Sequence, residues 1–129
     1  MNLNREEIAA FEQRYRTTFV NSLAGFRQVV LVGTKSAEGI TNLAIFNSLM
    51  HIGANPPLYG ILNRPDSVQR DTLQNILETK EYTLNFVRAT DYEKAHQTSA
   101  RYEKDVSEFK EVGFDEEYID GCAAPFVKD

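Results

Sequence analysis

The chain passes from a predicted strand into a predicted helix through Asn63-Arg64-Pro65-Asp66-Ser67-Val68-Gln69-Arg70-Asp71-Thr72-Leu73-Gln74-Asn75-Ile76. The apolar run before it, residues 57–62, is typical of a strand, and Leu73, Ile76 and Leu77 recur after it at helical spacing. Guanidinium groups, hydroxyls and the free N–H groups of a first helical turn all bind phosphate oxygens. This junction is therefore a candidate phosphate site. A solvated loop in which the arginines pair with Asp66 and Asp71 is the alternative explanation.

The composition predicts a single globular domain over residues 1–129, with 42% hydrophobic and 26% charged residues. The net charge of −5 makes nucleic acid an improbable partner, because phosphate backbones need a basic face. A single cysteine, Cys122, cannot form an intramolecular disulfide and suits a reducing cytoplasm. We find no apolar run near the ~20 residues of a membrane helix, no signal-peptide pattern, and neither a CxxC nor an HExxH metal motif. We therefore expect a cytoplasmic protein without a metal site.

Hydrophobic periodicity predicts four strands, over residues 29–34, 40–46, 58–62 and 82–87. The first two are joined by the turn Lys35-Ser36-Ala37-Glu38-Gly39 and should form a hairpin. Residues 55–57, Asn-Pro-Pro, break the chain before the third strand.

Four helices are predicted from caps and apolar spacing. The first covers about residues 4–14, with Asn4 and Glu7 as a capping box. The second follows a cap at Asp71 or Thr72, and a third, short helix opens with a capping box of Thr90 and Glu93. The fourth carries the apolar residues Val106, Phe109 and Val112 and ends at Gly113.

Strands clustered in the middle of the chain, with helices between them, predict an α+β fold with a mostly antiparallel sheet or split barrel. Closure of a barrel filled by side chains takes about five to eight strands, so four strands are too few. We therefore expect the barrel to be incomplete.

The other polar clusters favour structural interpretations. His96-Gln97-Thr98-Ser99 is most simply a helix end whose hydroxyls bind their own carbonyls. His51 is more often a loop or packing histidine than a base, and Cys122 has no activating neighbour in the sequence. Neither a GxSxG elbow nor a Walker A or GxGxxG loop is present.

Taken in order, several segments resemble the flavin-reductase-like family of FMN-binding split-barrel proteins, from about residue 27 to the end of the chain. The most specific pair is Asn55-Pro56-Pro57-Leu58 followed by Arg70-Asp71-Thr72-Leu73-Gln74-Asn75-Ile76. The other matching segments are Thr41-Asn42-Leu43-Ala44-Ile45-Phe46-Asn47-Ser48, Tyr82-Thr83-Leu84-Asn85, His96-Gln97-Thr98-Ser99-Ala100, Asp105-Val106-Ser107-Glu108-Phe109 and Ala124-Pro125-Phe126-Val127-Lys128.

The resemblance implies a split β-barrel that binds FMN, usually at a homodimer interface. It implies that the FMN phosphate meets Arg64, Arg70 and Thr72, with Asp71 in the same motif. The remaining cofactor-binding residues would be Asn47 and Ser48 near the phosphate, and the backbone around Asn42, Ala44 and Phe46 beside the isoalloxazine ring. In the family's reductases NAD(P)H delivers hydride to the flavin, so no side chain need act as acid or base.

Three features depart from the family pattern. The chain has Ile45 where the family commonly has Pro and Asn47 where it has Ser, although an Asn amide can still donate to phosphate. Family members are also longer than this chain, and their additional strands complete the barrel. We therefore expect the open sheet edge of this chain to be covered by dimerisation. The expected function is an NAD(P)H-dependent flavin oxidoreductase. The alternatives are a non-catalytic or degenerate flavin-binding and dimerisation module, and a small α+β interaction domain with a surface arginine pair.

Overall fold

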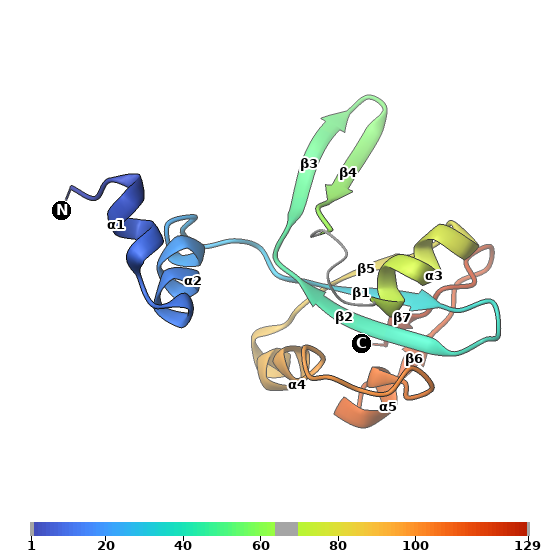
Figure 1. Cartoon of the computed structure of the whole chain (residues 1–129). Helices are drawn as coiled ribbons and strands as arrows, with labels where there is room; N and C mark the ends of the chain where they lie inside the picture. The colour runs from blue at the N-terminus through green and yellow to red at the C-terminus, as the bar shows by residue number, and fades with distance from the viewer. Residues whose placement is uncertain (1, 64–69, 129) are drawn as a thin grey trace.

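The computed structural model describes residues 2–63 and 70–128, and its centre is a three-stranded antiparallel sheet (Figure 1). The sheet has the order β2 (Thr41–Phe46), β1 (Val30–Lys35), β5 (Thr83–Phe86). The β1–β2 hairpin is confirmed, with Thr34 opposite Asn42. β-Branched and apolar residues fill β1, whose first five residues are buried, as expected for the central strand. The fold is α+β with antiparallel sheets that do not close into a barrel, as the sequence predicts.

Helices cover the two faces of this sheet. Leu31 and Leu43 point to one face, where they form the core with Ala95, Phe109 and Phe114. That face is covered by α4 (Tyr92–Gln97) and α5 (Glu108–Val112), whereas α3 (Asp71–Thr79) lies on the opposite face (Figure 1). Because side chains alternate along a strand, Thr34 and Asn42 face α3.

The end of the chain crosses the core face directly over Gly33. A Cβ built on Gly33 would lie 2.3 Å from the carbonyl oxygen of Pro125 and 2.5 Å from Oγ1 of Thr83, so no side chain fits there. Thr83 donates its hydroxyl to the Pro125 oxygen at 2.6 Å, and the Val127 N–H donates to Oδ1 of Asn85 at 2.9 Å. Two short strands, β6 (Glu116–Glu117) and β7 (Phe126–Val127), pair beside this crossing.

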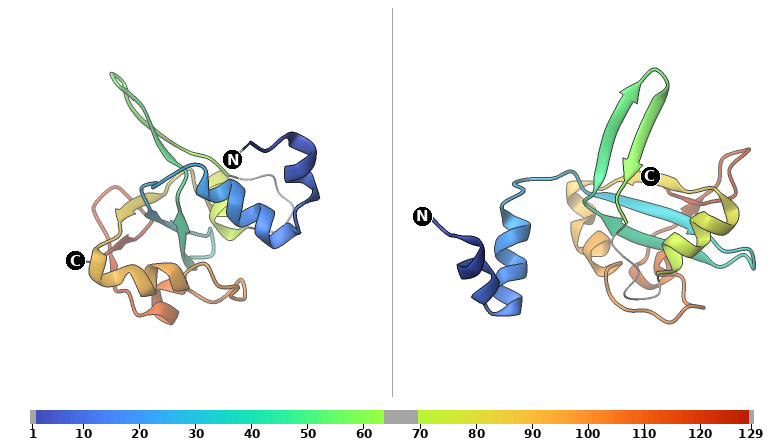
Figure 2. Two further views of the ribbon diagram at one scale, coloured as in Figure 1. Left: turned by 90° about the vertical axis from the view of Figure 1, so that its left-hand side faces the viewer. Right: turned by 45° about the horizontal axis from the view of Figure 1, so that its top comes forward.

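Two elements project away from the body, as Figure 1 and the right-hand view of Figure 2 show. The helical arm consists of α1 (Arg5–Ala10) and α2 (Gln13–Ser22), neither of which has a buried residue. The β3–β4 hairpin pairs β3 (Leu49–Ala54) with β4 (Pro57–Ile61) as a separate two-stranded sheet.

The prediction of one helix over residues 4–14 was wrong in its extent. The capping box of Asn4 and Glu7 is confirmed, but the helix stops at Phe11, whose φ of −60° and ψ of 144° are extended. A second helix begins at Gln13, because the Glu12 carboxylate accepts from the N–H groups of Arg14 and Tyr15. Glutamate is not among the preferred N-cap residues, so this start was missed.

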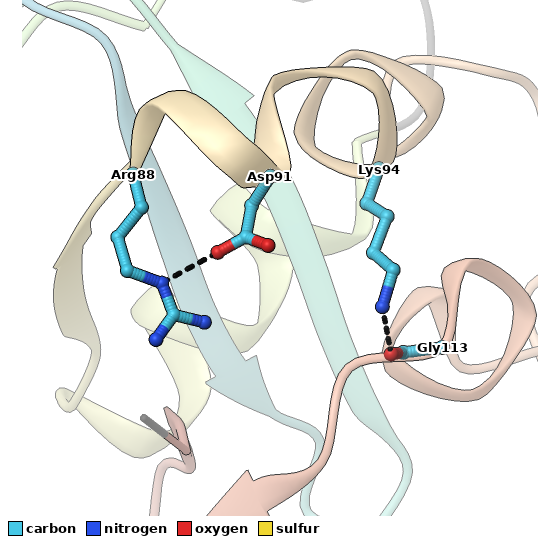
Figure 3. A network of polar contacts seen from close by, with 4 residues as sticks. All are labelled: Arg88, Asp91, Lys94 and Gly113. Carbon is cyan, nitrogen blue, oxygen red and sulfur yellow. Dashed lines mark hydrogen bonds and ion pairs between the residues drawn. The ribbon is translucent and has the colours of Figure 1, made fainter.

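Two predicted caps were also wrong. The N-cap of α3 is Arg70, so Asp71 and Thr72 lie inside its first turn. Thr90 belongs to the 3₁₀ helix Ala89–Asp91, and α4 begins after Asp91, which pairs with Nε of Arg88 at 2.6 Å (Figure 3). The end of α5 at Gly113 is confirmed by its left-handed φ of 74°. Lys94 of α4 donates to the Gly113 oxygen at 2.8 Å and so joins the two helices (Figure 3).

Candidate functional site

The candidate site begins at the first turn of α3. Arg70 is the extended N-cap residue, with φ of −131° and ψ of 106°, and its side chain makes no capping hydrogen bond. Among the described residues, Nε of Arg70 and Oδ1 of Asp71 are buried side-chain atoms without a hydrogen-bond partner. Leaving a buried polar atom unpaired costs ~1–3 kcal/mol, so such an atom in a folded protein calls for an explanation, of which a bound water or ion is one. Arg64, the second predicted phosphate ligand, lies outside the described residues.

Behind this turn lies a buried polar quartet, which we define as Thr34, Asn42, Thr72 and Asn75. The Asn42 amide donates to Oγ1 of Thr72 at 2.9 Å and to Oγ1 of Thr34 at 3.3 Å. The Asn75 amide donates to the same Thr34 oxygen at 3.1 Å. All four side chains are buried, so each hydrogen bond forms away from water. The structure thus brings the predicted site residues Asn42 and Thr72 into direct contact.

The rest of the predicted site lies along β2 and the chain that follows it. Ala44 and Phe46 share the Asn42 face of β2 by strand alternation, and both are half-buried. Asn47 is exposed. Ser48 donates its hydroxyl to the Leu62 oxygen at 2.9 Å and so closes the base of the β3–β4 hairpin. The Ser48 hydroxyl is therefore engaged with the hairpin.

One polar residue next to the site was missed by sequence reasoning. Glu108, in the first turn of α5, accepts the backbone N–H of Leu43 through Oε2 at 3.0 Å and so covers the outer edge of β2. Burial raises the pKa of Glu108, and the negative charge of Asp71 adds to the rise, against the N–H groups that its carboxylate accepts. In an amphipathic helix pattern a glutamate usually indicates a solvated face. Only the contact with Leu43 identifies Glu108 as a partly buried hydrogen-bond acceptor.

We expect Glu108→Gln to raise the thermal unfolding temperature at about pH 7, with the gain disappearing toward about pH 4. The pKa of Glu108 is higher in the folded than in the unfolded state. The contribution of Glu108 to stability is therefore fully present at a pH below its unfolded pKa, and it is lost as the pH rises through its folded pKa. Glutamine stays neutral and keeps an oxygen for the Leu43 N–H. Calorimetry at both pH values checks this. Glu111→Gln on the exposed side of α5 is the matched control, and an equal gain at both pH values would contradict the expectation.

A groove of about 800 Å³ lies on the body between the end of β5 and α4. Its apolar lining includes Val29, Ile45, Phe86 and Tyr92, and His96 also lines it.

The structural interpretation of residues 96–99 is confirmed, because Thr98 and Ser99 donate their hydroxyls to the Ala95 and His96 oxygens. In the part of the chain that the structure describes, no helix is long and apolar enough to cross a membrane, and no cluster of three His, Cys, Asp or Glu residues could hold a metal ion.

The family model of the flavin reductase like domain matches residues 26–129. An uncharacterised protein of Aquifex aeolicus is 32% identical over 105 residues, which cover 80% of this chain and 54% of that protein. An uncharacterised protein of Halalkalibacterium halodurans is 30% identical over 118 residues, which cover 90% of this chain and 55% of that protein. The chain therefore spans about half the length of the curated relatives that it matches.

Solved structures share the fold over the whole chain. A protein of Shewanella frigidimarina assigned as a flavin reductase with a split barrel domain superposes with a TM-score of 0.94 at 50% identity, covering 100% of this chain and 64% of that chain. The 2-nitrobenzoate 2-nitroreductase of Pseudomonas fluorescens has a TM-score of 0.82 at 23% identity, covering 100% of this chain and 60% of its own. At that identity the second likeness concerns the fold alone.

Proposed function

The chain belongs to the flavin reductase like family, and from this premise we propose that it binds FMN and reduces it with hydride from NAD(P)H. The observation that carries the proposal is the first turn of α3. There, Nε of Arg70 is buried and has no hydrogen-bond partner among the described residues, and the Arg70 side chain does not cap the helix. Positive charge, free N–H groups and a neighbouring hydroxyl are the donor set that a phosphate monoester needs.

The residues present fit FMN, with each part of the cofactor meeting a suitable group. We propose that Arg70, Thr72 and Arg64 hold the phosphate, with Asn47 and Ser48 close by. The Asp71 carboxylate only accepts hydrogen bonds, so it suits a ribityl hydroxyl rather than the phosphate. The backbone around Asn42, Ala44 and Phe46 would flank the isoalloxazine ring.

When bound, the flavin supplies the redox chemistry, and the protein supplies binding and orientation. Within this proposal no side chain exchanges a proton with the reacting atoms. We place the protein in the cytoplasm, which the single cysteine supports, since the cytosol keeps thiols reduced.

A titration of FMN with the purified chain, monitored by flavin fluorescence, tests binding. The oxidation of NADH and NADPH at saturating FMN tests the reductase activity. Saturable quenching with steady nicotinamide oxidation is the expected result. A chain that neither quenches FMN nor changes its absorbance overturns it. Binding without oxidation instead supports the second candidate, a non-catalytic flavin-binding module, which the open three-stranded sheet favours.

We further propose that two copies associate through the helical arm and the β3–β4 hairpin. An isolated two-stranded hairpin is marginally stable in water, and both elements present large apolar side chains to solvent. These are Tyr15, Val20, Leu23 and Phe26 on or just after α2, and Met50, Ile52, Leu58 and Tyr59 on the hairpin. If each of these side chains exposes roughly 100 Å², together they approach the ~800 Å² that each partner buries in a standard interface. The superposition on the Shewanella protein covers the whole chain, arm included.

Charges on the apolar stripe of α2 should weaken this association. We expect the double variant Tyr15→Glu, Leu23→Glu to weaken the dimer at least about tenfold, because two charges would be desolvated in the interface. Light scattering after gel filtration over a concentration series measures it against the monomer mass of 14.7 kDa. Thr17→Glu with Asn21→Glu places the same charges on the opposite side of α2 as a control. A wild type that is monomeric throughout would refute the proposal.

A further inference from the structure

We propose that Thr34 and Asn75 are positioning residues for the phosphate site, because their hydrogen bond fixes α3 relative to the central strand β1. This inference rests on the proposed function, since it concerns the phosphate of the same flavin. Neither side chain forms a hydrogen bond with the proposed ligand-binding side chain of Arg70 in the described part of the chain. They act through the helix that carries it.

The most deeply buried side chains of α3 are polar. Thr72 and Asn75 are buried, whereas Leu73 and Ile76 are half-buried and Leu77 is 59% exposed. The side chain of the N-cap residue Arg70 makes no capping hydrogen bond. The hydrogen bonds of the buried polar quartet are therefore the principal directional contacts between α3 and the sheet.

The geometry of the quartet determines both the height and the rotation of α3. Thr34 and Asn42 lie opposite each other on neighbouring strands, and Thr72 and Asn75 are three residues apart on one helix face. The Asn42–Thr72 bond of 2.9 Å joins β2 to the first turn, and the Asn75–Thr34 bond of 3.1 Å joins β1 to the next turn. Hydrogen bonds weaken steeply when distance or angle changes, whereas apolar contacts tolerate slippage.

The same network also sets the hydrogen-bonding state of Thr72. Its Oγ1 accepts from the Asn42 amide, so the hydroxyl hydrogen remains available for donation to an anion. Asn42 in turn is held by its second contact, with Thr34, at 3.3 Å. Removing the Thr34 oxygen takes the acceptor from the Asn75 amide and leaves the Asn42 amide with Thr72 as its acceptor. We expect this change to loosen the phosphate-binding turn without altering the side chains of Arg70 and Thr72.

The first test compares Thr34→Val with Thr83→Val. Valine matches the shape of threonine, and Thr83 is an equally buried threonine on β5 that donates to Pro125 instead of facing α3. We expect Thr34→Val to weaken FMN binding about tenfold and riboflavin binding by less than about twofold, since riboflavin lacks the phosphate. Thr83→Val should leave the ratio of FMN affinity to riboflavin affinity unchanged, whereas Asn75→Ala should lower this ratio. Equal losses for both flavins in Thr34→Val would overturn the inference.

The second test needs no flavin. Hydrogen exchange should accelerate selectively at the amides of α3 in Thr34→Val and Asn75→Ala, and not in Thr83→Val. Unchanged protection of α3 would refute the positioning role. A wild type that binds neither FMN nor riboflavin overturns the proposed function instead, and hydrogen exchange then still decides whether these residues fix the helix.

Discussion

Arg70→Ala is expected to weaken FMN binding by roughly ten- to a hundredfold while leaving riboflavin binding nearly unchanged. A charge-assisted hydrogen bond to an anion contributes ~1.5–3 kcal/mol, and the site of this guanidinium is already partly desolvated. Riboflavin carries the same ring and ribityl chain without the phosphate, so the difference between the two flavins isolates the phosphate contact. Fluorescence titrations at one fixed ionic strength measure both affinities.

Two further variants make this result specific. Arg70→Lys keeps the charge but loses the planar fork, so its FMN affinity should lie between wild type and Arg70→Ala. Arg101→Ala removes an exposed arginine outside the site and should leave both affinities unchanged. If Arg70→Ala weakens FMN and riboflavin equally, the arginine acts through the fold rather than through the phosphate. Thermal unfolding of each variant separates these two cases.

The elements that could be predicted from the sequence are those encoded by local chemistry. Buried β-branched runs predict β1, β2 and β5 to within one or two residues. The capping box at Asn4 and the left-handed Gly113 are likewise short-range signals, and both are confirmed.

The missed elements lack such a signal. None of the six residues of β3 is buried, because the hairpin stands away from the body. A register shift between His51 and Gly53 also disturbs the alternation of side chains along the strand. The cap at Thr90 failed because Arg88 and Asp91 form their own local pair in the 3₁₀ turn. Competing local contacts of this kind cannot be ranked from residue types alone.

The candidate site divides in the same way. The junction at Arg70 is visible in the sequence because a strand, basic residues and a helix start coincide there. Thr34 and Glu108 are not, since a threonine in a strand is an ordinary β-former and a glutamate in a helix is ordinarily solvated. Their contacts span 41 residues from Thr34 to Asn75 and 65 residues from Glu108 to Leu43. Such pairs become evident only when β1, β2, α3 and α5 are placed together.

The largest loss of stability is expected from Phe109→Ala, at ~3–5 kcal/mol. Phe109 is the largest fully buried side chain of the core cluster, which also contains Leu31 and Leu43. Its ring lies 3.5 Å from the point where a Cβ of Gly33 would stand, so it fills the space below the centre of the sheet. Alanine would leave a cavity there, and α5, only five residues long, would lose its main anchor to the sheet.

Urea unfolding followed by circular dichroism, at one fixed protein concentration, measures this loss. Phe86→Ala is the matched control, because Phe86 on β5 is 64% exposed and its truncation should cost less than about 1 kcal/mol. A loss below about 1 kcal/mol for Phe109→Ala would contradict the proposed core. Phe109 lies on the face of the sheet opposite α3, so the folded fraction of this variant should retain the wild-type preference for FMN over riboflavin. Arg70→Ala should show the reverse pattern, a lost preference at little cost in stability, because the core and the proposed phosphate site lie on opposite faces of one sheet.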